Sequence, residues 1–271
     1  MALIIKGDEK LFSTTAKLEQ IFLLRDEDTG DSRLQVTKEY IRKGYKFTVE
    51  NSQSELCCLQ VLSGEGYCES KKISNTDILF ISHDHKTVFV AKADTVILKT
   101  TVKDFKRFEK LSNQPSKGIR VINWHDEPVL QSEHDARQRI YIATKNLWGT
   151  FAVKGEIIIY PPNTEAPPHF HVGAEHFQYV LSGEGLAVFE DRTVNLQAGD
   201  LVYNFENEIH SFKNKSNERF TFVEFFVPGD CETIWTTTEK ICTWNPTNKN
   251  LKGYQPTRYI PKHIHGEKVD I

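Results

Sequence analysis

The sequence contains no long hydrophobic run. Across its 271 residues no apolar stretch approaches the roughly 20 residues that a membrane-spanning helix needs, so we expect no such helix. Long runs of one charge sign are also missing, and 34 basic and 37 acidic residues leave a net charge of −3. This balance argues against nucleic acid or an anionic membrane as the main partner. Residues 1–10 become charged too early for a signal peptide, which favours a cytoplasmic protein.

Paired cysteine motifs are absent as well. The five cysteines are odd in number, and none of them has the C-x-x-C spacing of a metal or redox motif. We expect all five to be reduced, buried thiols: Cys57, Cys58, Cys68, Cys231 and Cys242.

Helical periodicity is scarce in this sequence. Residues 102–111, with Phe105 and Phe108 three apart, are the one helical candidate. Elsewhere β-branched and aromatic residues dominate runs such as 155–160 and 220–227, which predicts strands. The length exceeds that of a typical domain of about 100–150 residues, so we expect two domains that are mainly β.

An internal repeat supports this division. The pentapeptide LSGEG occurs at residues 62–66 and again at residues 181–185. After each copy a turn leads to an aspartate that opens an apolar strand, Asp77 in the first case and Asp200 in the second. Such self-similarity indicates two related units.

Histidines gather around the second copy of the repeat. His169, His171 and His176 fall within eight residues, and His210 follows downstream. Positions i and i+2 of a β-strand share a face, so His169 and His171 are expected to point the same way. Neutral imidazole is a common ligand of Fe, Cu, Ni and Zn. The pattern therefore predicts a transition-metal site.

The two histidine-containing stretches resemble the two sequence motifs of the cupin superfamily. The first motif is His-x-His, three or four residues, usually Glu, six residues and Gly, and here it runs from His169 to Gly183. The second has Gly-Asp, then His, three residues and Asn, and here it runs from Gly199 to Asn214. The resemblance implies an all-β chain of two tandem cupin-type antiparallel β-barrels, of the double-stranded β-helix or jelly-roll-like kind. It also implies a divalent transition metal, with Fe(II) as the first expectation and Mn, Ni, Cu or Zn as alternatives.

One position departs from the family pattern. Where the first motif usually has glutamate, the six-residue gap to Gly183 selects His176, although the neighbouring Glu175 also satisfies the gap to His171. His176 shares a strand face with Gln178, whereas Glu175 points the other way. We therefore expect four metal ligands: His169, His171, His176 and His210.

The first repeat lacks these ligands. When the two LSGEG copies are aligned, the ligand positions of the first copy hold Glu50, Ser52, Cys57 and Thr87, so we expect this barrel to bind no metal. A second ligand pocket without metal is the alternative. The expected organisation is an N-terminal barrel at 1–111, a linker at 112–119, a metal-binding barrel at 120–228 and an extended arm at 229–271, packed on a barrel or on a partner subunit.

Three polar residues are candidate catalytic groups. Glu224 interrupts an apolar run, and strand alternation places it with Phe222 and Phe226. Inside the barrel Glu224 would be a buried acid with a raised pKa, whereas on the exposed face it would be an ordinary carboxylate. Gln178 would point into the barrel as a hydrogen-bond donor, or would bond only to backbone. Tyr203, near the expected barrel mouth, is a weaker candidate.

The resemblance implies a metal-dependent enzyme that acts on a small molecule. Four neutral ligands would leave a divalent ion its full charge, which favours an anionic, metal-chelating substrate. Iron-dependent dioxygenation is the leading expectation for such a histidine-rich cupin. Non-oxidative isomerase, decarboxylase or lyase chemistry is the alternative, and a non-enzymatic ligand-binding or sensor protein is a third. The expected partners are the small-molecule substrate and, in a homodimer, a second copy of the chain.

Overall fold

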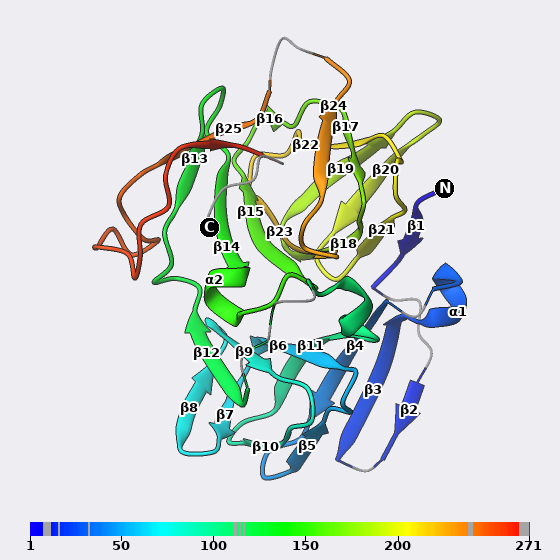
Figure 1. The fold of residues 1–271 in the computed structure, drawn as a ribbon, viewed down its shortest axis with the longest axis vertical. Coiled ribbons are helices and arrows are strands. Elements are labelled where there is room, and N and C mark those ends of the chain that lie inside the picture. The colour runs from blue at the N-terminus through cyan, green and yellow to red at the C-terminus, as the bar shows by residue number, and fades with distance from the viewer. Residues whose placement is uncertain are drawn as a thin grey trace. The chain divides into compact units, whose positions relative to one another are not determined.

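The chain folds into two units that consist mainly of antiparallel strands (Figure 1). The computed structural model describes residues 1–7, 12–15, 17–31, 33–110, 113, 115, 117–237, 241–265 and 271. We call the unit of Glu9–Trp124 and Trp148–Ala152 the first barrel. We call the unit of Met1–Asp8, His125–Leu147 and Val153–Ile271 the second barrel. The all-β fold of two tandem barrels is thereby confirmed.

Two sheets enclose the core of the first barrel. Among the described residues, one sheet has the order β12-β9-β6-β11-β4-β3-β2 and the other the order β5-β10-β7-β8. Both sheets contribute to one apolar cluster, which includes Phe47, Leu59, Phe89 and Ile97. The strands are β2 (Phe12–Thr14), β3 (Leu18–Leu24), β4 (Leu34–Ile41), β5 (Lys46–Glu50), β6 (Leu56–Ser63), β7 (Glu65–Cys68), β8 (Lys71–Ser74), β9 (Asp77–Ile81), β10 (Lys86–Ala91), β11 (Thr95–Val102) and β12 (Ile119–Asn123).

The second barrel has the same two-sheet plan. In the described part of the chain, its sheets have the orders β1-β21-β18-β23-β15-β14-β13-β25-β26 and β20-β19-β22-β17-β24, and β16 also pairs with β22. Val180, Ala187, Phe212 and Phe222 join the two sheets in one apolar cluster. The strands are β1 (Leu3–Ile5), β13 (Leu130–Ser132), β14 (Gln138–Ala143), β15 (Lys154–Tyr160), β16 (Thr164–Glu165), β17 (His169–Val172), β18 (Glu175–Ser182), β19 (Glu184–Phe189), β20 (Thr193–Gln197), β21 (Leu201–Asn204), β22 (His210–Asn214), β23 (Phe220–Val227), β24 (Glu232–Trp235), β25 (Thr243–Pro246) and β26 (His263–Ile264).

Helices are short in the described residues. They are α1 (Asp26–Thr29), α2 (Lys145–Trp148) and a 3-10 turn at Phe105–Phe108. The helix predicted over residues 102–111 is therefore wrong: β11 continues to Val102, because it is hydrogen-bonded on both sides to β4 and β6, and only the 3-10 turn follows. None of the helices among the described residues has the length and apolar character that crossing a membrane requires.

The ends of the two units differ from the expected boundaries of 1–111, 112–119 and 120–228. Strand β1 pairs with β21, with Leu3 opposite Tyr203, so the first residues of the chain belong to the second barrel. Strand β12 pairs with β9 of the first barrel, with Ile119 opposite Ile81. The first barrel therefore extends past the expected linker. Residues 111, 112, 114 and 116 lie outside the described residues.

The segment expected as an extended arm adds strands to both sheets of the second barrel. Strand β24 pairs with β17, whereas β25 pairs with β13 and β26 pairs with β25. We call the described residues 229–237 and 241–265 the arm. Its hydrogen bonds make the arm part of the barrel that carries the histidines.

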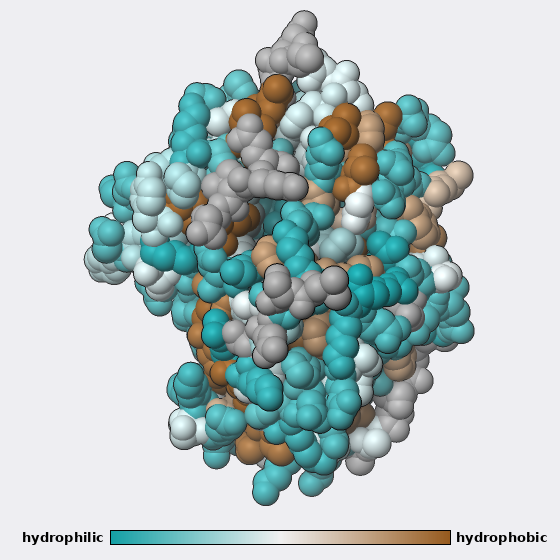
Figure 2. Space-filling model, in the orientation of Figure 1, coloured by the Kyte–Doolittle hydropathy of each residue, from teal (hydrophilic) through white to brown (hydrophobic). Residues whose placement is uncertain are grey.

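Most apolar side chains are buried in these cores. The face drawn in Figure 2 is mostly hydrophilic, and its hydrophobic residues form small separate groups. All five cysteines are free thiols; four are buried and Cys231 is partly buried, so the expectation of reduced thiols agrees with the fold and that of full burial fails only at Cys231.

The turn of the second LSGEG copy gives a test of the fold. Gly183 has a φ of +76°, and a Cβ there would lie 2.0 Å from the carbonyl oxygen of Arg219. Gly183→Ala combines a left-handed conformation with a backbone clash, and we expect it to lower the free energy of unfolding by about 2–4 kcal/mol. Gly173→Ala is the matched control, since Gly173 has a φ of +86° but open space around it, and should cost about 1 kcal/mol. If urea unfolding showed the same loss of unfolding free energy for both variants, the role of close packing at Gly183 would be contradicted.

Candidate metal centre

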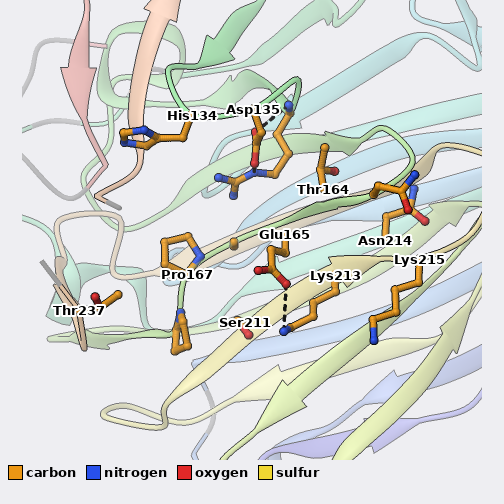
Figure 3. Close-up of a pocket in the computed structure, with 14 residues that line it drawn as sticks. His134, Asp135, Thr164, Glu165, Pro167, Ser211, Lys213, Asn214, Lys215 and Thr237 are labelled. Carbon is orange, nitrogen blue, oxygen red and sulfur yellow. Dashed lines mark hydrogen bonds and ion pairs between the residues drawn. The ribbon is translucent and has the colours of Figure 1, made fainter. Parts of the chain in front are cut away.

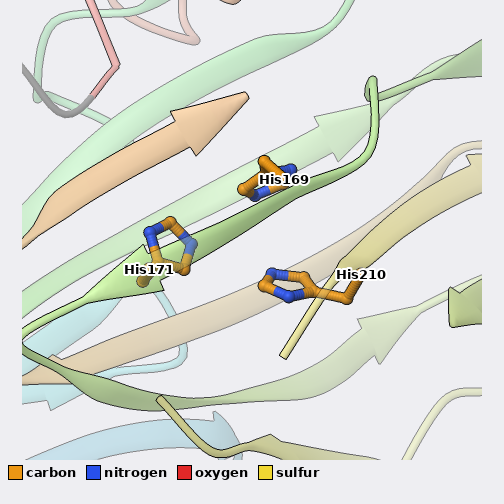
Figure 4. A group of neighbouring side chains, drawn as sticks. All are labelled: His169, His171 and His210. Atoms are coloured by element: carbon orange, nitrogen blue, oxygen red, sulfur yellow. The ribbon is translucent and has the colours of Figure 1, made fainter. Parts of the chain in front are cut away.

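Strands β17 and β22 bring three histidines together. His169 and His171 alternate on the same face of β17, and His169 lies directly opposite His210, the first residue of β22. One ligand nitrogen from each ring lies within 4.8 Å of the others. Figure 4 shows the three rings around a common space. Three of the four expected ligands therefore meet in the structure.

Backbone carbonyls set the tautomers of two of these rings. Nδ1 of His169 donates to the carbonyl of Pro167 at 2.9 Å, and Nδ1 of His210 donates to the carbonyl of Glu208 at 2.8 Å. A carbonyl oxygen only accepts, so Nδ1 carries the proton in both rings. The lone pair of Nε2 remains for a metal, which is the arrangement that metal-binding histidines use.

The third ring is oriented by the arm. The hydroxyl of Thr233 on β24 lies 3.1 Å from Nδ1 of His171, because β24 pairs with β17 and places Thr233 opposite His171. The arm thus supplies a hydrogen-bond partner to one of the candidate ligands.

Burial keeps these imidazoles neutral. It lowers the pKa of His169 and His171 well below the usual value, and neighbouring histidines lower both further. Burial also lowers the pKa of His210 to about 4. Neutral imidazole is the form that binds a metal, so the group is ready to coordinate one at neutral pH.

His176, the expected fourth ligand, lies beside the group of three. Its ring centroid is 4.7 Å from that of His171 and 4.9 Å from that of His210, and the ring stacks on Phe226. Within the described residues, His176 Nδ1 is buried and has no hydrogen-bond partner, while Nε2 lies 3.4 Å from the amide nitrogen of Asn204. An unpaired buried nitrogen in this place suits a metal ligand.

The predicted strand register around His176 agrees with the structure. His176 and Gln178 face the interior of the second barrel with Val180, which belongs to the apolar cluster. Glu175 is on the opposite face, where its carboxylate accepts a hydrogen bond from the hydroxyl of Tyr203. The structure therefore does not bring Tyr203 to the histidines, because its position on β21 pairs with Phe177 on that opposite face.

Glu224 is buried and faces inward. It lies on β23 between Glu156 on β15 and Gln178 on β18, and the amide nitrogen of Gln178 donates to it at 2.9 Å. Burial raises the pKa of Glu224 to about 8, with a further contribution from the neighbouring carboxylate of Glu156. Glu224 is therefore mostly protonated at neutral pH.

Arg139 is a site residue that the sequence reasoning missed. Its Nε lies 2.9 Å from a carboxylate oxygen of Glu156, and its guanidinium lies over the ring of Trp244, 4.4 Å from the centroid. Its Nη1 donates to Nδ1 of His265 in the arm. The signal was the position of Arg139 directly before the apolar residues 140–143, with Arg137 at i−2 on the same face of the extended chain.

A small cavity of about 30 Å³ joins these groups. Histidines, arginines, an acid and apolar side chains line it, and the arm contributes four of them. The lining residues are Arg137, Arg139, Ile158, Tyr160, Ala166, His169, His171, His210, Phe212, Phe222, Glu224, Trp235, Cys242, Trp244 and His265. Such a space admits a ligand of few atoms beside the histidines.

A wider cleft of about 610 Å³ lies next to this cavity (Figure 3). Both are lined by Arg137 and Ala166. In the cleft Lys213 forms an ion pair with Glu165 at 3.0 Å, and Lys215 also lines it. The cleft is a route by which an anion could approach Arg137.

The first barrel has no comparable group of ligands in the part of the chain that the structure describes. Cys57, at the position of His176, is buried in the apolar cluster of that barrel. Thr87, at the position of His210, contacts the sulfur of Cys68 at 3.2 Å. At these two positions the side chains thus pack within the first barrel, and the absence of a metal there stays a prediction.

Sequence comparison connects the histidine-bearing segment with known proteins. A family model described as cupin domain matches residues 156–226, which hold all four histidines. A segment of 67 residues, 25% of the chain, is 30% identical to the oxalate-binding protein of Thermotoga maritima. The match spans only 55% of that protein's length.

Solved structures resemble the chain over both barrels. A variant of oxalate decarboxylase from Bacillus subtilis is similar with a TM-score of 0.69 at 12% identity, over 86% of this chain and 79% of that one. Oxalate decarboxylase from Lactobacillus farciminis, solved as a formate complex, is similar with a TM-score of 0.68 at 14% identity, over 86% and 88%. These identities are low, so the likeness concerns the fold. The second barrel thus contains a segment that matches the cupin domain, and the chain as a whole has a two-barrel fold similar to that of these proteins.

Proposed function

We propose that this chain is a metal-dependent enzyme that removes carbon dioxide from a small dicarboxylate such as oxalate, without net oxidation. One observation carries the proposal: three neutral histidines share a cavity with a buried cation, Arg139, and a protonated acid, Glu224. The proteins that resemble the chain include an oxalate-binding protein and oxalate decarboxylases, which supports oxalate as the first substrate to test.

The histidines would hold the metal. His169, His171 and His210 offer Nε2 atoms, and His176 would be the fourth ligand through its unpaired nitrogen. A bound divalent ion would supply a positive centre that binds carboxylate oxygens. Imidazole donors suit Fe, Ni, Cu and Zn, but a solved oxalate decarboxylase is described with Mn(II) centres, so we now propose Mn(II) in place of the Fe(II) first expected.

Arg139 and the size of the cavity select the substrate class. A guanidinium donates hydrogen bonds to carboxylate oxygens, and Arg139 lies in the wall of the cavity. A volume of about 30 Å³ is room for roughly two water molecules, which argues against a large substrate.

Glu224 would supply the proton that the reaction consumes. In oxalate decarboxylation the carbon–carbon bond breaks, carbon dioxide leaves, and the remaining carbon keeps the electron pair. That carbon then takes a proton from Glu224 to give formate, and solvent restores the proton on Glu224. The raised pKa keeps the acid protonated at neutral pH, as a general acid requires.

The iron-dependent dioxygenase expected from the sequence gains no support from these likenesses, and the decarboxylase alternative takes its place in our proposal. The second candidate is a protein that binds oxalate without turning it over, which the name of the Thermotoga maritima relative favours. Measuring whether oxalate is converted into products distinguishes the decarboxylase from the binding protein.

We expect the purified chain to contain about one transition metal ion. His171→Ala and His176→Ala should each lower metal affinity by about 10-fold or more, because each removes one nitrogen donor. Glu175→Ala is the matched control on the opposite face of the same strand and should keep its metal. Metal analysis after dialysis would contradict the ligand set if Glu175→Ala emptied the site while His176→Ala stayed full.

Acid should destabilise the metal-free chain. The pKa of His210 is about 4 when folded and about 6.5 when unfolded, so between these values the unfolded state binds more protons. The stability that neutral His210 contributes is present above pH 6.5 and is lost as the pH falls towards 4. His210 alone should account for about 2 kcal/mol between pH 7 and pH 5. Urea unfolding of the metal-free chain should show a smaller loss for His210→Gln and the full loss for the exposed control His134→Gln.

We expect the Mn(II)-loaded chain to convert oxalate into equal amounts of carbon dioxide and formate, with no net consumption of oxygen. Glu224→Gln should lower kcat by about 10²–10⁴-fold with unchanged metal content, and kcat of the unmodified chain should fall as the pH rises through about 8. Glu175→Gln is the control. Stoichiometric oxygen uptake would restore the dioxygenase reading, and tight oxalate binding without products would favour the binding protein.

A further inference from the structure

The arm closes one wall of the cavity that holds the histidines. Trp235, Cys242, Trp244 and His265 all come from the arm and line this space. The arm is fixed there by strand pairing, and the backbone N–H of His265 donates to the carbonyl of Cys242 at 2.9 Å. Side chains of the arm are therefore placed to contact whatever binds at the histidines.

His265 is a polar side chain of the arm that lines the cavity beside the candidate ligands. Its ring is buried, with its centroid 5.8 Å from that of His171 and 6.5 Å from that of His169. His265 is not part of the group of three among the described residues, whose ligand nitrogens all lie within 4.8 Å of one another. It lines the same cavity as those three histidines, so a small ligand in that space would lie beside His265 as well.

Arg139 determines which nitrogen of His265 carries the proton. Nη1 of Arg139 contacts Nδ1 of His265, and a guanidinium has donors but no acceptor. Nδ1 must therefore accept, and in a neutral imidazole the proton then sits on Nε2. Arg139 itself is held by Glu156 and by the ring of Trp244. The ring of His265 thus presents a fixed N–H donor.

His263, two residues earlier, differs in this respect. Its Nε2 lies 2.7 Å from the hydroxyl of Tyr141 and its Nδ1 donates to the carbonyl of Pro261 at 3.0 Å. Both nitrogens are used within the protein, and His263 does not line the cavity. It is a matched control for His265 on the same strand segment.

We propose that His265 is a specificity-determining residue that donates a hydrogen bond from Nε2 to a carboxylate oxygen of the ligand at the metal. Together with Arg139 it would form a positive, donor-rich wall that holds one carboxylate group, while the metal binds the other end. The inference rests on the proposed function, since it takes a small carboxylate as the ligand. The inference concerns how the ligand is bound, whereas the proposed function concerns the reaction and the proton supplied by Glu224.

Calorimetric titration of oxalate and formate into the Mn(II)-loaded full-length chain tests this role. His265→Phe removes the donor, and His265→Asn keeps an acceptor near Arg139 but does not reach the Nε2 position. Both should weaken oxalate binding by about 10-fold or more, with metal content and Tm close to those of the unmodified chain. His265→Gln restores a donor near the Nε2 position and should recover most of the affinity, while His263→Gln should leave it unchanged.

Normal oxalate affinity in His265→Asn would overturn the inference, because it would reduce His265 to a support for Arg139. If the unmodified chain binds metal but neither carboxylate, the inference and the proposed function both fail. If oxalate binds in a His265-dependent way and no formate appears, only the decarboxylase proposal fails.

Discussion

A permanently charged side chain in the interior of the second barrel organises the candidate site. Arg139 cannot lose its proton and must be compensated where it is buried. Glu156 supplies the opposite charge, and the carboxylate that balances Arg139 also disfavours ionisation of Glu224 beside it. On its other side Arg139 holds His265 in one tautomer. Burial is the largest cause of the raised pKa of Glu224; the charge of Glu156 adds to it and that of Arg139 opposes it. The ion pair thus fixes the tautomer of an imidazole and lies beside a buried acid.

The two barrels differ in the side chains at one row of paired strand positions. In the second barrel, strand pairing aligns Glu156, Glu224 and Gln178 across the sheet. The LSGEG alignment and the same pairings place Thr37, Lys99 and Leu59 at these positions in the first barrel. With the ligands also replaced, an apolar cluster packs in that barrel beside the buried pair of Thr37 and Glu39. The same strand framework therefore supports either a compact core or a chemical site, depending on a few inward side chains.

The sequence predicted those features of the site that follow from the spacing of neighbouring residues. It predicted fewer of the features that depend on contacts between distant segments. Strand alternation placed His176 and Glu224 inward, and the motif spacing brought His169 and His210 together. Tyr203 was misplaced because one residue of register decides the face of a strand, and the distance to a barrel mouth cannot be counted along the chain. The part played by the arm was not predictable, because Thr233 and His265 reach the histidines only through pairing between distant segments.

Strand β1 has a consequence for the order in which this chain assembles. Residues 3–5 are synthesised about 200 residues before their partners on β21, residues 201–203. At ribosomal rates of about 5–20 residues per second, the first strand waits roughly ten seconds or more for its neighbour to be made. Strand β1 can complete its edge of the sheet that contains His176 only after the whole first barrel has been translated. Closure of the second barrel therefore follows translation of the first barrel, and it brings strands made at widely separated times into a single sheet.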